Sequence, residues 1–351
     1  MKNLFGGIYS GKTVFITGDT GFKGSWLALW LKKLGANVTG FSLAPSTKPS
    51  HFEILSCAYE SVRGDILNPD FLKPALLRVK PDIIFHLAAQ SLVRESYRNP
   101  AGTYLTNVIG TLNVLEAARD CKSVKAFVNV TTDKVYENNQ SGKPFHESDP
   151  FGGDDMYSSS KACSEILTAS YRRSFLEKSE MLLASARAGN VIGGGDWSED
   201  RLIPDAMKAA SQKKAVVIRY PNSVRPWQHV LEPLNGYLKL GEQLLKGNAS
   251  AATGWNFGPQ LTDCIAVKDV LEKSATVWND VRWIQDSEAN PHEAALLMLD
   301  SSKANKDLGW NPIWNLDTAV SKTISWYKTY YESTKAETDS QLEEYCDLLS
   351  R

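Results

Sequence analysis

Tyr157 and Lys161 lie four residues apart in the sequence. On a helix this spacing places both side chains on one face. A free phenol has a pKa of about 10 and is a poor base at neutral pH, but a neighbouring ammonium group favours the phenolate. We predict that Tyr157 takes a proton from a substrate hydroxyl with the help of Lys161. A surface tyrosine beside a solvated lysine is the alternative, because this spacing is common by chance.

A second reactive cluster, Thr132, Asp133 and Lys134, directly follows a β-branched stretch at 126–130 that is typical of a strand. Open α/β sheets bind ligands at the carboxyl ends of their strands. A simple hydride-transferring enzyme needs only the Thr132 hydroxyl there. Asp133 and Lys134 therefore indicate a second reaction, and loss of water suits them, because it needs one acid and one base. In the alternative interpretation, Asp133 caps the following turn and Lys134 pairs with it at the surface.

A glycine-rich loop, G-x-x-G-x-x-G at 18–24, connects a predicted first strand to an amphipathic helix. Glycines allow a tight turn and close approach of a pyrophosphate to the helix N-terminus. Lys23 in this loop either pairs with that pyrophosphate or is solvated. The expected acidic residue is missing near 41–43, and there is no arginine pair for a 2′-phosphate, so we predict NAD rather than NADP. The predicted cofactor residues are Gly18, Thr20, Gly21, Phe22, Lys23, Gly24, Asp65, Ile66, Leu87, Ala88, Ala89, Gln90, Asn107, Tyr157 and Lys161.

The elements that must position these groups alternate between strand and helix. Strands are predicted at 13–17, 37–43, 82–85, 126–130 and 182–187, and helices at 26–34, 103–119 and 158–173. This order predicts an α/β fold, a doubly wound parallel Rossmann sheet with a smaller α/β substrate-binding lobe. We expect an NAD-binding domain over 1–189, regained in part around 226–260, and a mainly substrate-binding lobe over 190–351. The charged tail at 332–351 is predicted to be a surface helix with frayed ends.

Composition excludes several classes of protein. The 351 residues carry 39 basic and 40 acidic side chains, interspersed along the chain, for a net charge of −1. We therefore expect neither nucleic acid nor a membrane as partner, and the lack of a long apolar stretch predicts a cytoplasmic location. The five cysteines show no Cys-x-x-Cys spacing, so we expect free thiols. No metal site is indicated.

These motifs together resemble those of the extended short-chain dehydrogenase/reductases and, within them, the nucleotide-sugar 4,6-dehydratases. The resemblance covers roughly residues 11–330, and its details match the CDP-glucose branch. In place of Asp133-Lys134, the dTDP-glucose branch carries Asp-Glu. It also carries Arg-Asp-Trp at the position of Arg225-Pro226-Trp227, which leaves the base-reading contacts open. The matching stretches are GFKGSW at 21–26, TDK at 132–134, RAGNVIGGGDW at 187–197, RPWQHV at 225–230 and HEA at 292–294.

The resemblance implies a three-step reaction on CDP-D-glucose with bound NAD. Tyr157, supported by Lys161 and Thr132, would deprotonate the 4-hydroxyl as C4 is oxidised. Lys134 would then remove the C5 hydrogen while Asp133 protonates the departing 6-hydroxyl, and the hydride returns to C6. The resemblance also implies a homodimer formed by the helices at 103–119 and 157–173, and a role in making 3,6-dideoxyhexoses for surface polysaccharide, such as lipopolysaccharide O-antigen.

The resemblance further implies a substrate site in the second lobe. Asn190, Arg201 and Arg225 are expected to hold the diphosphate, because guanidinium groups match phosphate geometry. Trp227, Gln228, His229, His292 and Glu293 are candidates for lining the nucleotide or sugar pocket.

Two other functions remain open from the residues alone. A UDP-hexose 4-epimerase shares the glycine loop and the Tyr157/Lys161 pair but needs no acid and base beside Thr132. A non-catalytic dinucleotide sensor would retain the fold but commonly loses the tyrosine or lysine.

Overall fold

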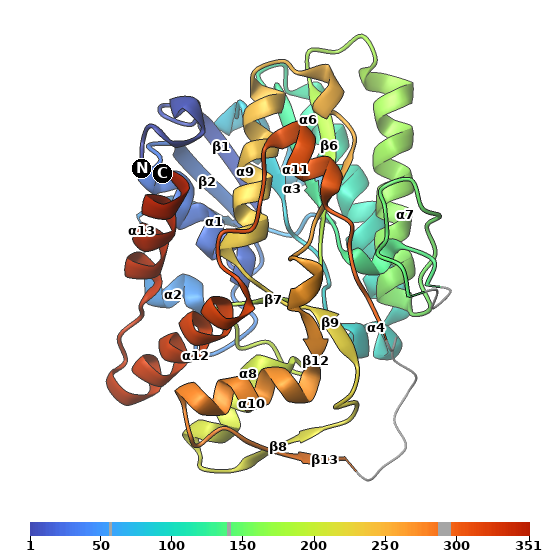
Figure 1. Cartoon of the computed structure of the whole chain (residues 1–351). Coiled ribbons are helices and arrows are strands. Elements are labelled where there is room, and N and C mark those ends of the chain that lie inside the picture. Colours follow the sequence, from blue (N-terminus) through green and yellow to red (C-terminus); the bar gives the residue numbers. More distant parts are fainter. Residues whose placement is uncertain (56–57, 139–141, 287–295) are drawn as a thin grey trace.

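A parallel sheet of seven strands forms the centre of the computed structural model, which describes residues 1–55, 58–138, 142–286 and 296–351 (Figure 1). The strand order is β11-β6-β5-β4-β1-β2-β3, so the chain starts in the middle and winds outward in both directions. The predicted doubly wound α/β class is confirmed. The strands are β1 (Thr13–Thr17), β2 (Asn37–Ser42), β3 (Glu60–Arg63), β4 (Ile83–His86), β5 (Ala126–Val130), β6 (Leu182–Ala188) and β11 (Gly254–Phe257).

Both faces of this sheet are buried, because alternate strand residues enter two different cores. Val14 and Ile16 belong to one hydrophobic cluster, whereas Phe15 between them belongs to another on the opposite face. The same alternation separates Ile83 from Ile84 in β4. This pattern explains why the strands read as continuous apolar runs.

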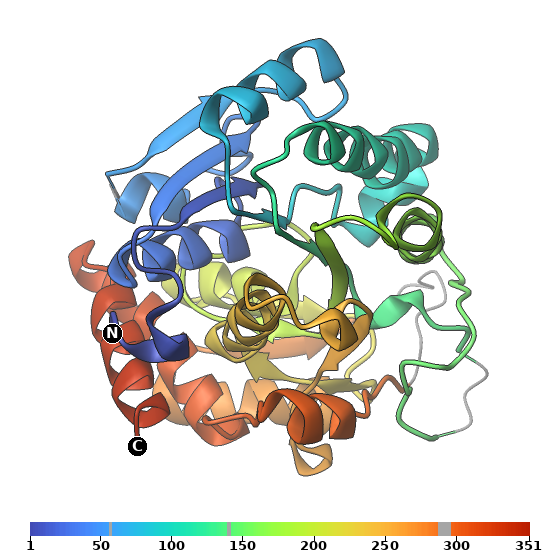
Figure 2. The ribbon, with the colours of Figure 1, turned by 90° about the horizontal axis from the view of Figure 1, so that it is seen from above.

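Helices cover each face of the sheet, as the view from above shows (Figure 2). One face carries α1 (Phe22–Lys33), α9 (Leu231–Leu245), α11 (Ser302–Leu308) and α13 (Thr338–Leu349). The other carries α3 (Pro69–Val79), α6 (Thr111–Asp120) and α7 (Met156–Tyr171). The helix predicted at 103–119 is present, but a π-turn, η2 (Leu105–Gly110), separates α6 from α5 (Pro100–Tyr104). A second π-turn, η4 (Arg172–Leu176), follows α7.

Smaller elements lie below the carboxyl ends of the sheet strands in Figure 1 and have a core of their own, which includes Met207, Leu271 and Trp326. The helices here are α8 (Leu202–Ser211), α10 (Val267–Val277) and α12 (Leu316–Ser333). The strands pair as β7 (Val191–Ile192) with β10 (Gln228–His229), β9 (Val224–Pro226) with β12 (Cys264–Ala266), and β8 (Ala215–Ile218) with β13 (Arg282–Gln285). The remaining short elements are η1 (Leu4–Gly7), α2 (His51–Leu55), α4 (Val93–Arg98), η3 (Asp133–Val135), η5 (Ala249–Ala251) and η6 (Leu261–Asp263).

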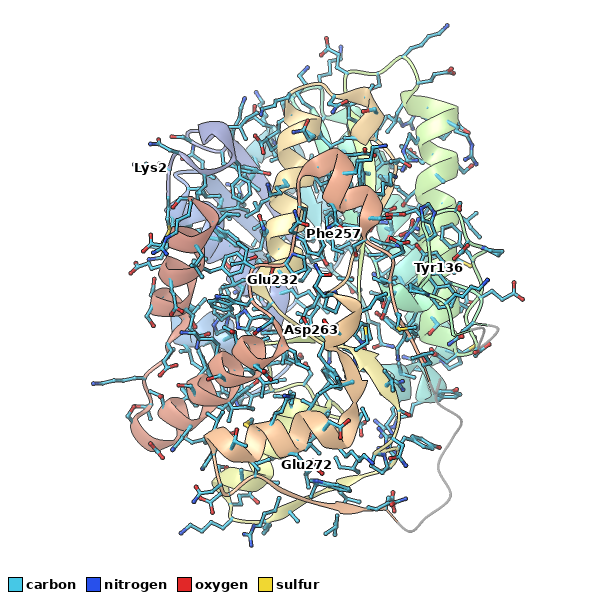
Figure 3. The ribbon with its side chains drawn as sticks, in the orientation of Figure 1. Lys2, Tyr136, Glu232, Phe257, Asp263 and Glu272 are labelled. Atoms are coloured by element: carbon cyan, nitrogen blue, oxygen red, sulfur yellow. The ribbon has the colours of Figure 1, made fainter. Side chains whose placement is uncertain are left out.

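The C-terminal segment is helical as predicted, but its predicted surface position is wrong. Leu342 and Tyr345 in α13 are fully buried and pack in the main core. The Tyr345 hydroxyl donates a 2.7 Å hydrogen bond to Glu232, which lies in the interior of the molecule (Figure 3). The charged residues of α13 occupy its outer face. The helix is therefore amphipathic, and its charged composition alone did not reveal the apolar face.

Cys121, Cys163, Cys264 and Cys346 are free thiols, as predicted, and Cys57 lies outside the described residues. Among the described helices, none has both the length and the apolar character needed to cross a bilayer.

Candidate active site

A cavity of about 690 Å³ opens where the carboxyl ends of the sheet strands face the smaller elements. All five predicted catalytic residues line it, together with most of the predicted cofactor and substrate residues. The predicted residues in its wall are Gly18, Thr20, Gly21, Phe22, Lys23, Gly24, Asp65, Ile66, Leu87, Ala88, Ala89, Thr132, Asp133, Lys134, Tyr157, Lys161, Asn190, Arg201, Arg225 and Trp227.

The glycine loop is shaped by close backbone approach. Gly18 has a φ of +79°, and a Cβ there would lie 2.6 Å from the backbone nitrogen of Ala88. A Cβ on Gly24 would lie 2.0 Å from the Gly18 carbonyl oxygen. Helix α1 then begins at Phe22 without an acidic residue in its first turn. No side chain caps this N-terminus and its first residues line the cavity, so its uncapped backbone N–H groups suit a pyrophosphate.

Gln90 and Asn107, predicted as cofactor residues, are not among the residues that line this cavity. The backbone nitrogen of Gln90 donates to Asn107 Oδ1 at 2.8 Å, and Asn107 Nδ2 donates to Ser160 Oγ at 2.9 Å. Their polar groups are thus used within the protein, where they hold the loop after β4 against α7. A sequence pattern marks this loop but does not tell which of its side chains face inward.

Asp133 is the most unusual group in the cavity wall. Its carboxylate is 2 % exposed; Oδ1 accepts a 3.0 Å hydrogen bond from Thr132, whereas Oδ2 has no hydrogen-bond partner in the structure. Burial raises the pKa of Asp133 above its ordinary value, although the positive charge of Lys134 opposes the shift. A Cβ on Gly189 would lie 2.4 Å from Oδ2, so only glycine leaves room for this carboxylate. A buried carboxyl group with a raised pKa is suited to giving up a proton.

Tyr157 and Lys161 share one face of α7 and are both buried, at 8 % and 5 % exposure. Lys161 Nζ donates a 3.1 Å hydrogen bond to the carbonyl of Val130, at the end of β5. Burial lowers the pKa of Lys161 to about 8 and raises the pKa of Tyr157 to about 12, with a hydrogen bond to Thr132 opposing the latter shift. The phenolate expected from the sequence is therefore not favoured by the protein alone, because desolvation outweighs the neighbouring charges.

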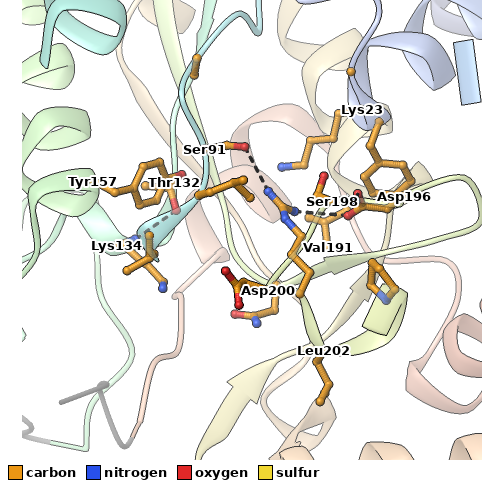
Figure 4. A pocket seen from close by; sticks show the side chains of 18 of the residues that line it. Lys23, Ser91, Thr132, Lys134, Tyr157, Val191, Asp196, Ser198, Asp200 and Leu202 are labelled. Carbon is orange, nitrogen blue, oxygen red and sulfur yellow. Dashed lines mark hydrogen bonds and ion pairs between the residues drawn. The ribbon is translucent and has the colours of Figure 1, made fainter. Parts of the chain in front are cut away.

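Lys23 and Asp196 lie across the cavity from Tyr157, Thr132 and Lys134 (Figure 4). Arg201 donates to Ser91 Oγ at 3.2 Å and lies 3.5 Å from the Asp196 carboxylate. Burial, together with the positive charge of Arg201, lowers the pKa of Lys23 to about 7. An anion bound beside Lys23 and Arg201 would favour the charged form of Lys23, so these two side chains suit an anionic ligand.

Arg225 and Trp227 contribute to the opposite part of the wall, each 4 % exposed. The charge of Arg225 acts on Asp133, where it helps to lower the pKa of that carboxyl. Trp227 Nε1 donates to the carbonyl of Ile265 at 3.1 Å, which fixes the indole ring. Asn190 also lines the cavity.

Gln228 and His229, predicted as pocket residues, are not among the residues that line this cavity. Gln228 Nε2 donates to the carbonyl of Phe257 at 2.8 Å. His229 is fully buried, with its ring 4.8 Å from that of Trp314, and burial lowers its pKa to about 3. Strand β10, which contains both residues, pairs with β7 and points them into the core. His292 and Glu293 lie outside the described residues.

Several wall residues had no role assigned from the sequence, among them Ser42, Ser91, Asp196, Arg219 and Tyr220. They come from separate segments that only the fold brings together. For Ser42 a signal existed, because it ends the strand that lacks the expected acidic residue.

Comparisons with known proteins agree with this geometry. A family model described as GDP-mannose 4,6 dehydratase matches residues 15–323. CDP-glucose 4,6-dehydratase of Salmonella typhimurium is 47% identical over 330 residues, which cover 92% of each chain. Among solved structures, an epimerase from Methanothermobacter thermautotrophicus has a TM-score of 0.83 at 26% identity and covers 93% of this chain and 94% of its own. The dTDP-glucose 4,6-dehydratase of Bacillus anthracis, solved with NAD, has a TM-score of 0.75 at 22% identity and covers 92% of this chain and 98% of its own.

Proposed function

This chain belongs to the GDP-mannose 4,6 dehydratase family, and we propose that it converts CDP-D-glucose to CDP-4-keto-6-deoxy-D-glucose and water with bound NAD. The observation that carries this proposal is the Asp133 carboxyl group, buried in the cavity wall with an unpartnered oxygen and a raised pKa. An elimination needs such an acid beside the groups that oxidise the sugar. The 47% identical Salmonella relative supports the choice of a CDP-linked sugar.

NAD fits the glycine loop of this chain. The N-terminus of α1 and Lys23 would hold its pyrophosphate, Asp65 its adenine, and Lys161 the nicotinamide ribose. When bound, NAD supplies an acceptor for a hydride that is later returned to the same sugar, so no cofactor is consumed.

The protein's own groups carry the protons. Tyr157 would receive the proton of the 4-hydroxyl, with Thr132 holding the same hydroxyl in place. The positive charge of the oxidised ring would offset the desolvation that raises the pKa of Tyr157. Once C4 is a ketone, Lys134 would remove the acidified C5 hydrogen, and Asp133 would protonate the 6-hydroxyl as it departs as water. As the hydride returns to C6, Lys134 would give its proton back to C5, and exchange with water would move the proton gained by Tyr157 to Asp133.

Arg201, Arg225 and Asn190 would bind the diphosphate of the sugar nucleotide. Both arginines line the cavity, and Arg201 already contacts a neutral hydroxyl, Ser91, that an anion can replace. The base would then lie against Trp227, whose ring is fixed by its hydrogen bond to Ile265.

An epimerase is the second candidate, because an epimerase structure matches this fold well. An epimerase must oxidise and reduce C4 only, and a buried acid with a raised pKa next to Thr132 serves no step of that reaction. Asp133 therefore favours the dehydratase.

The test is to incubate the purified protein with CDP-glucose, with and without added NAD, and to follow the mass of the sugar nucleotide. A product lighter by one water, without net reduction of NAD, is the expected result. A product of unchanged mass but altered stereochemistry would indicate an epimerase, and stoichiometric reduction of NAD would contradict the roles of Asp133 and Lys134. In a Lys134→Met variant, oxidation should persist while dehydration is lost; normal turnover would exclude Lys134 as the base.

We further propose that the protein forms a homodimer through α5, η2, α6 and α7. Three large apolar side chains on these helices, Leu105, Ile109 and Ile166, and a fourth, Phe175 in the η4 turn that follows α7, are exposed by 44 to 55 %. Pairing with the same helices of a second copy would bury them, which is favourable at roughly 25 cal/mol per Å². Sedimentation of an Ile109→Arg variant should show monomer, whereas Val217→Arg, at a site on β8 that is more exposed than Ile109, should leave the dimer intact. We also propose a cytoplasmic location and, from the proposed CDP-glucose activity, a role in dideoxyhexose synthesis.

A further inference from the structure

Ser42 occupies the place at the end of β2 where many dinucleotide-binding folds carry an acidic residue for the ribose 2′-hydroxyl. It lines the cavity together with Leu43, Ala44 and Ser46. No acidic side chain occurs in this part of the wall, yet the site is expected to prefer NAD.

A carboxylate nevertheless lies directly behind Ser42. Asp19, the second residue of the glycine loop, is fully buried and accepts a 2.7 Å hydrogen bond from Ser42 Oγ at its Oδ1. Its Oδ2 accepts from Ser61 Oγ at 2.5 Å and from the Tyr59 hydroxyl at 3.2 Å. A Cβ on Gly40 would lie 2.1 Å from this carboxylate, so β2 has room for Asp19 only because residue 40 is glycine.

This arrangement fixes what Ser42 can do toward a ligand. An ionised carboxylate only accepts hydrogen bonds, so the hydroxyl hydrogen of Ser42 is committed to Asp19. Ser42 Oγ can then only accept, and its one other contact is a long one, 3.4 Å from the backbone nitrogen of Thr20. A lone pair therefore remains for a hydroxyl donor in the cavity.

NAD and NADP present groups of opposite hydrogen-bonding character to Ser42. The ribose 2′-hydroxyl of NAD is a hydrogen-bond donor, whereas the 2′-phosphate of NADP is an anionic acceptor. The phosphate would find no donor at Ser42 and would approach the buried charge of Asp19 in a poorly solvated place. Arg63, the cation at the end of β3, donates to Ser61 Oγ at 2.6 Å and lies over the Phe52 ring, away from the cavity wall.

We propose that Asp19 and Ser42 form a hydrogen-bond relay that selects the free 2′-hydroxyl of NAD against the 2′-phosphate of NADP. Ser42 makes the contact, and Asp19 sets its polarity and supplies the charge. This inference rests on the proposed function only in that the cavity must accept a nicotinamide dinucleotide at the glycine loop.

Calorimetric titration of nucleotide-free protein with NAD and with NADP tests the pair, because it needs no substrate and no turnover. Wild-type protein should bind NAD more tightly. Ser42→Ala should raise the Kd for NAD about tenfold and change that for NADP less, since one hydrogen bond to NAD is lost. Asp19→Asn keeps the shape and removes the charge, so its Kd for NADP should fall by about tenfold.

Ser61→Ala is the matched control, because it removes a hydroxyl from the same carboxylate but does not line the cavity. Its NADP-to-NAD ratio of Kd values should stay within about twofold of wild type. Melting curves check that each variant is folded, and Ser42→Ala carries the test if Asp19→Asn is not. An unchanged ratio in folded Ser42→Ala overturns the relay alone. Wild-type protein that binds NAD but forms no dehydrated product contradicts the proposed function and leaves the relay intact.

Discussion

Two buried carboxylates near α7 show how hydrogen-bond partners decide the use of the same chemical group. Glu165, one turn after Lys161, accepts hydrogen bonds from Arg187, Ser185 and Thr131 and is paired with the Arg187 guanidinium at 2.9 Å. These partners lower its pKa below the ordinary value despite its burial. Asp133, which follows the end of β5, has an unpartnered oxygen and a raised pKa. One carboxylate is fixed as a charge that holds the structure, whereas the other is kept ready to carry a proton.

Hydrogen bonds connect Glu165 to the segment that carries Asp133. Its bond to Thr131 connects α7 to the segment that continues into Thr132 and Asp133, and Arg187 extends the network to the Tyr136 hydroxyl at 2.6 Å. The catalytic helix and the catalytic loop are thus tied to one buried ion pair. This buried network therefore holds the candidate catalytic residues in fixed positions at the cavity.

The largest effect on catalytic activity is expected from a substitution of Asp133. Asp133→Asn cannot donate the proton, so we expect product formation to fall by about 10²- to 10⁴-fold. Its free energy of unfolding at neutral pH should not fall, because a poorly solvated charge is removed. Mass-resolved turnover and urea denaturation measure both. A large loss of stability would mean that Asp133 is structural.

The opposite outcome is expected at Glu165. Glu165→Gln leaves the Arg187 guanidinium buried without a counter-charge, and we expect the free energy of unfolding to fall by about 3–5 kcal/mol. Urea denaturation measures it, with Glu180→Gln, in an exposed pair with Lys125, as the control. Turnover of folded protein should decline less than in Asp133→Asn. A stability equal to wild type would exclude the ion pair as the support of the site.

The pH dependence sharpens the comparison because the two shifts have opposite signs. Glu165 has a lowered folded pKa, so its contribution to stability is present above its ordinary value of 4.5 and is lost as pH falls through the folded pKa. Asp133 has a raised pKa, so its contribution is complete below 3.8 and is lost as pH rises through the folded pKa. The stability deficit of Glu165→Gln should therefore shrink on acidification from pH 7. The relative stability of Asp133→Asn should instead grow as pH rises. Denaturation series from about pH 3 to 8 test both; parallel trends would contradict the assignment.

The smallest effect is expected at an exposed pair near the cavity mouth. Arg94 lies 2.6 Å from Asp200, and its side chain is 44% exposed. Arg94→Ala should change the free energy of unfolding by about 0–1 kcal/mol, since exposed ion pairs contribute little. Thermal melts at low and high salt measure it. A loss of unfolding free energy comparable to that of Glu165→Gln would show that burial does not explain the different contributions of the Arg94–Asp200 and Glu165–Arg187 pairs.

The sequence by itself predicted five strands of the sheet, the glycine loop and the five candidate catalytic residues. Strand β5 ends at Val130 as predicted, and Tyr157 and Lys161 share a helix face, because both features depend on neighbours a few residues away. The family resemblance added the roles of Asp133 and Lys134, which local pattern alone left open.

Only the tertiary structure decided which polar groups are left free. Gln228 and His229 were predicted as pocket residues, but in the structure they lie in a two-residue strand and are buried in the core. The charged tail read as surface until α13 placed Tyr345 against Glu232. Asp19 meets Ser42 across 23 positions, and Glu165 meets Arg187 across 22. Periodicity reports which face of an element is apolar, but the partner of a buried polar atom comes from a distant segment, and that partner sets its charge and its function.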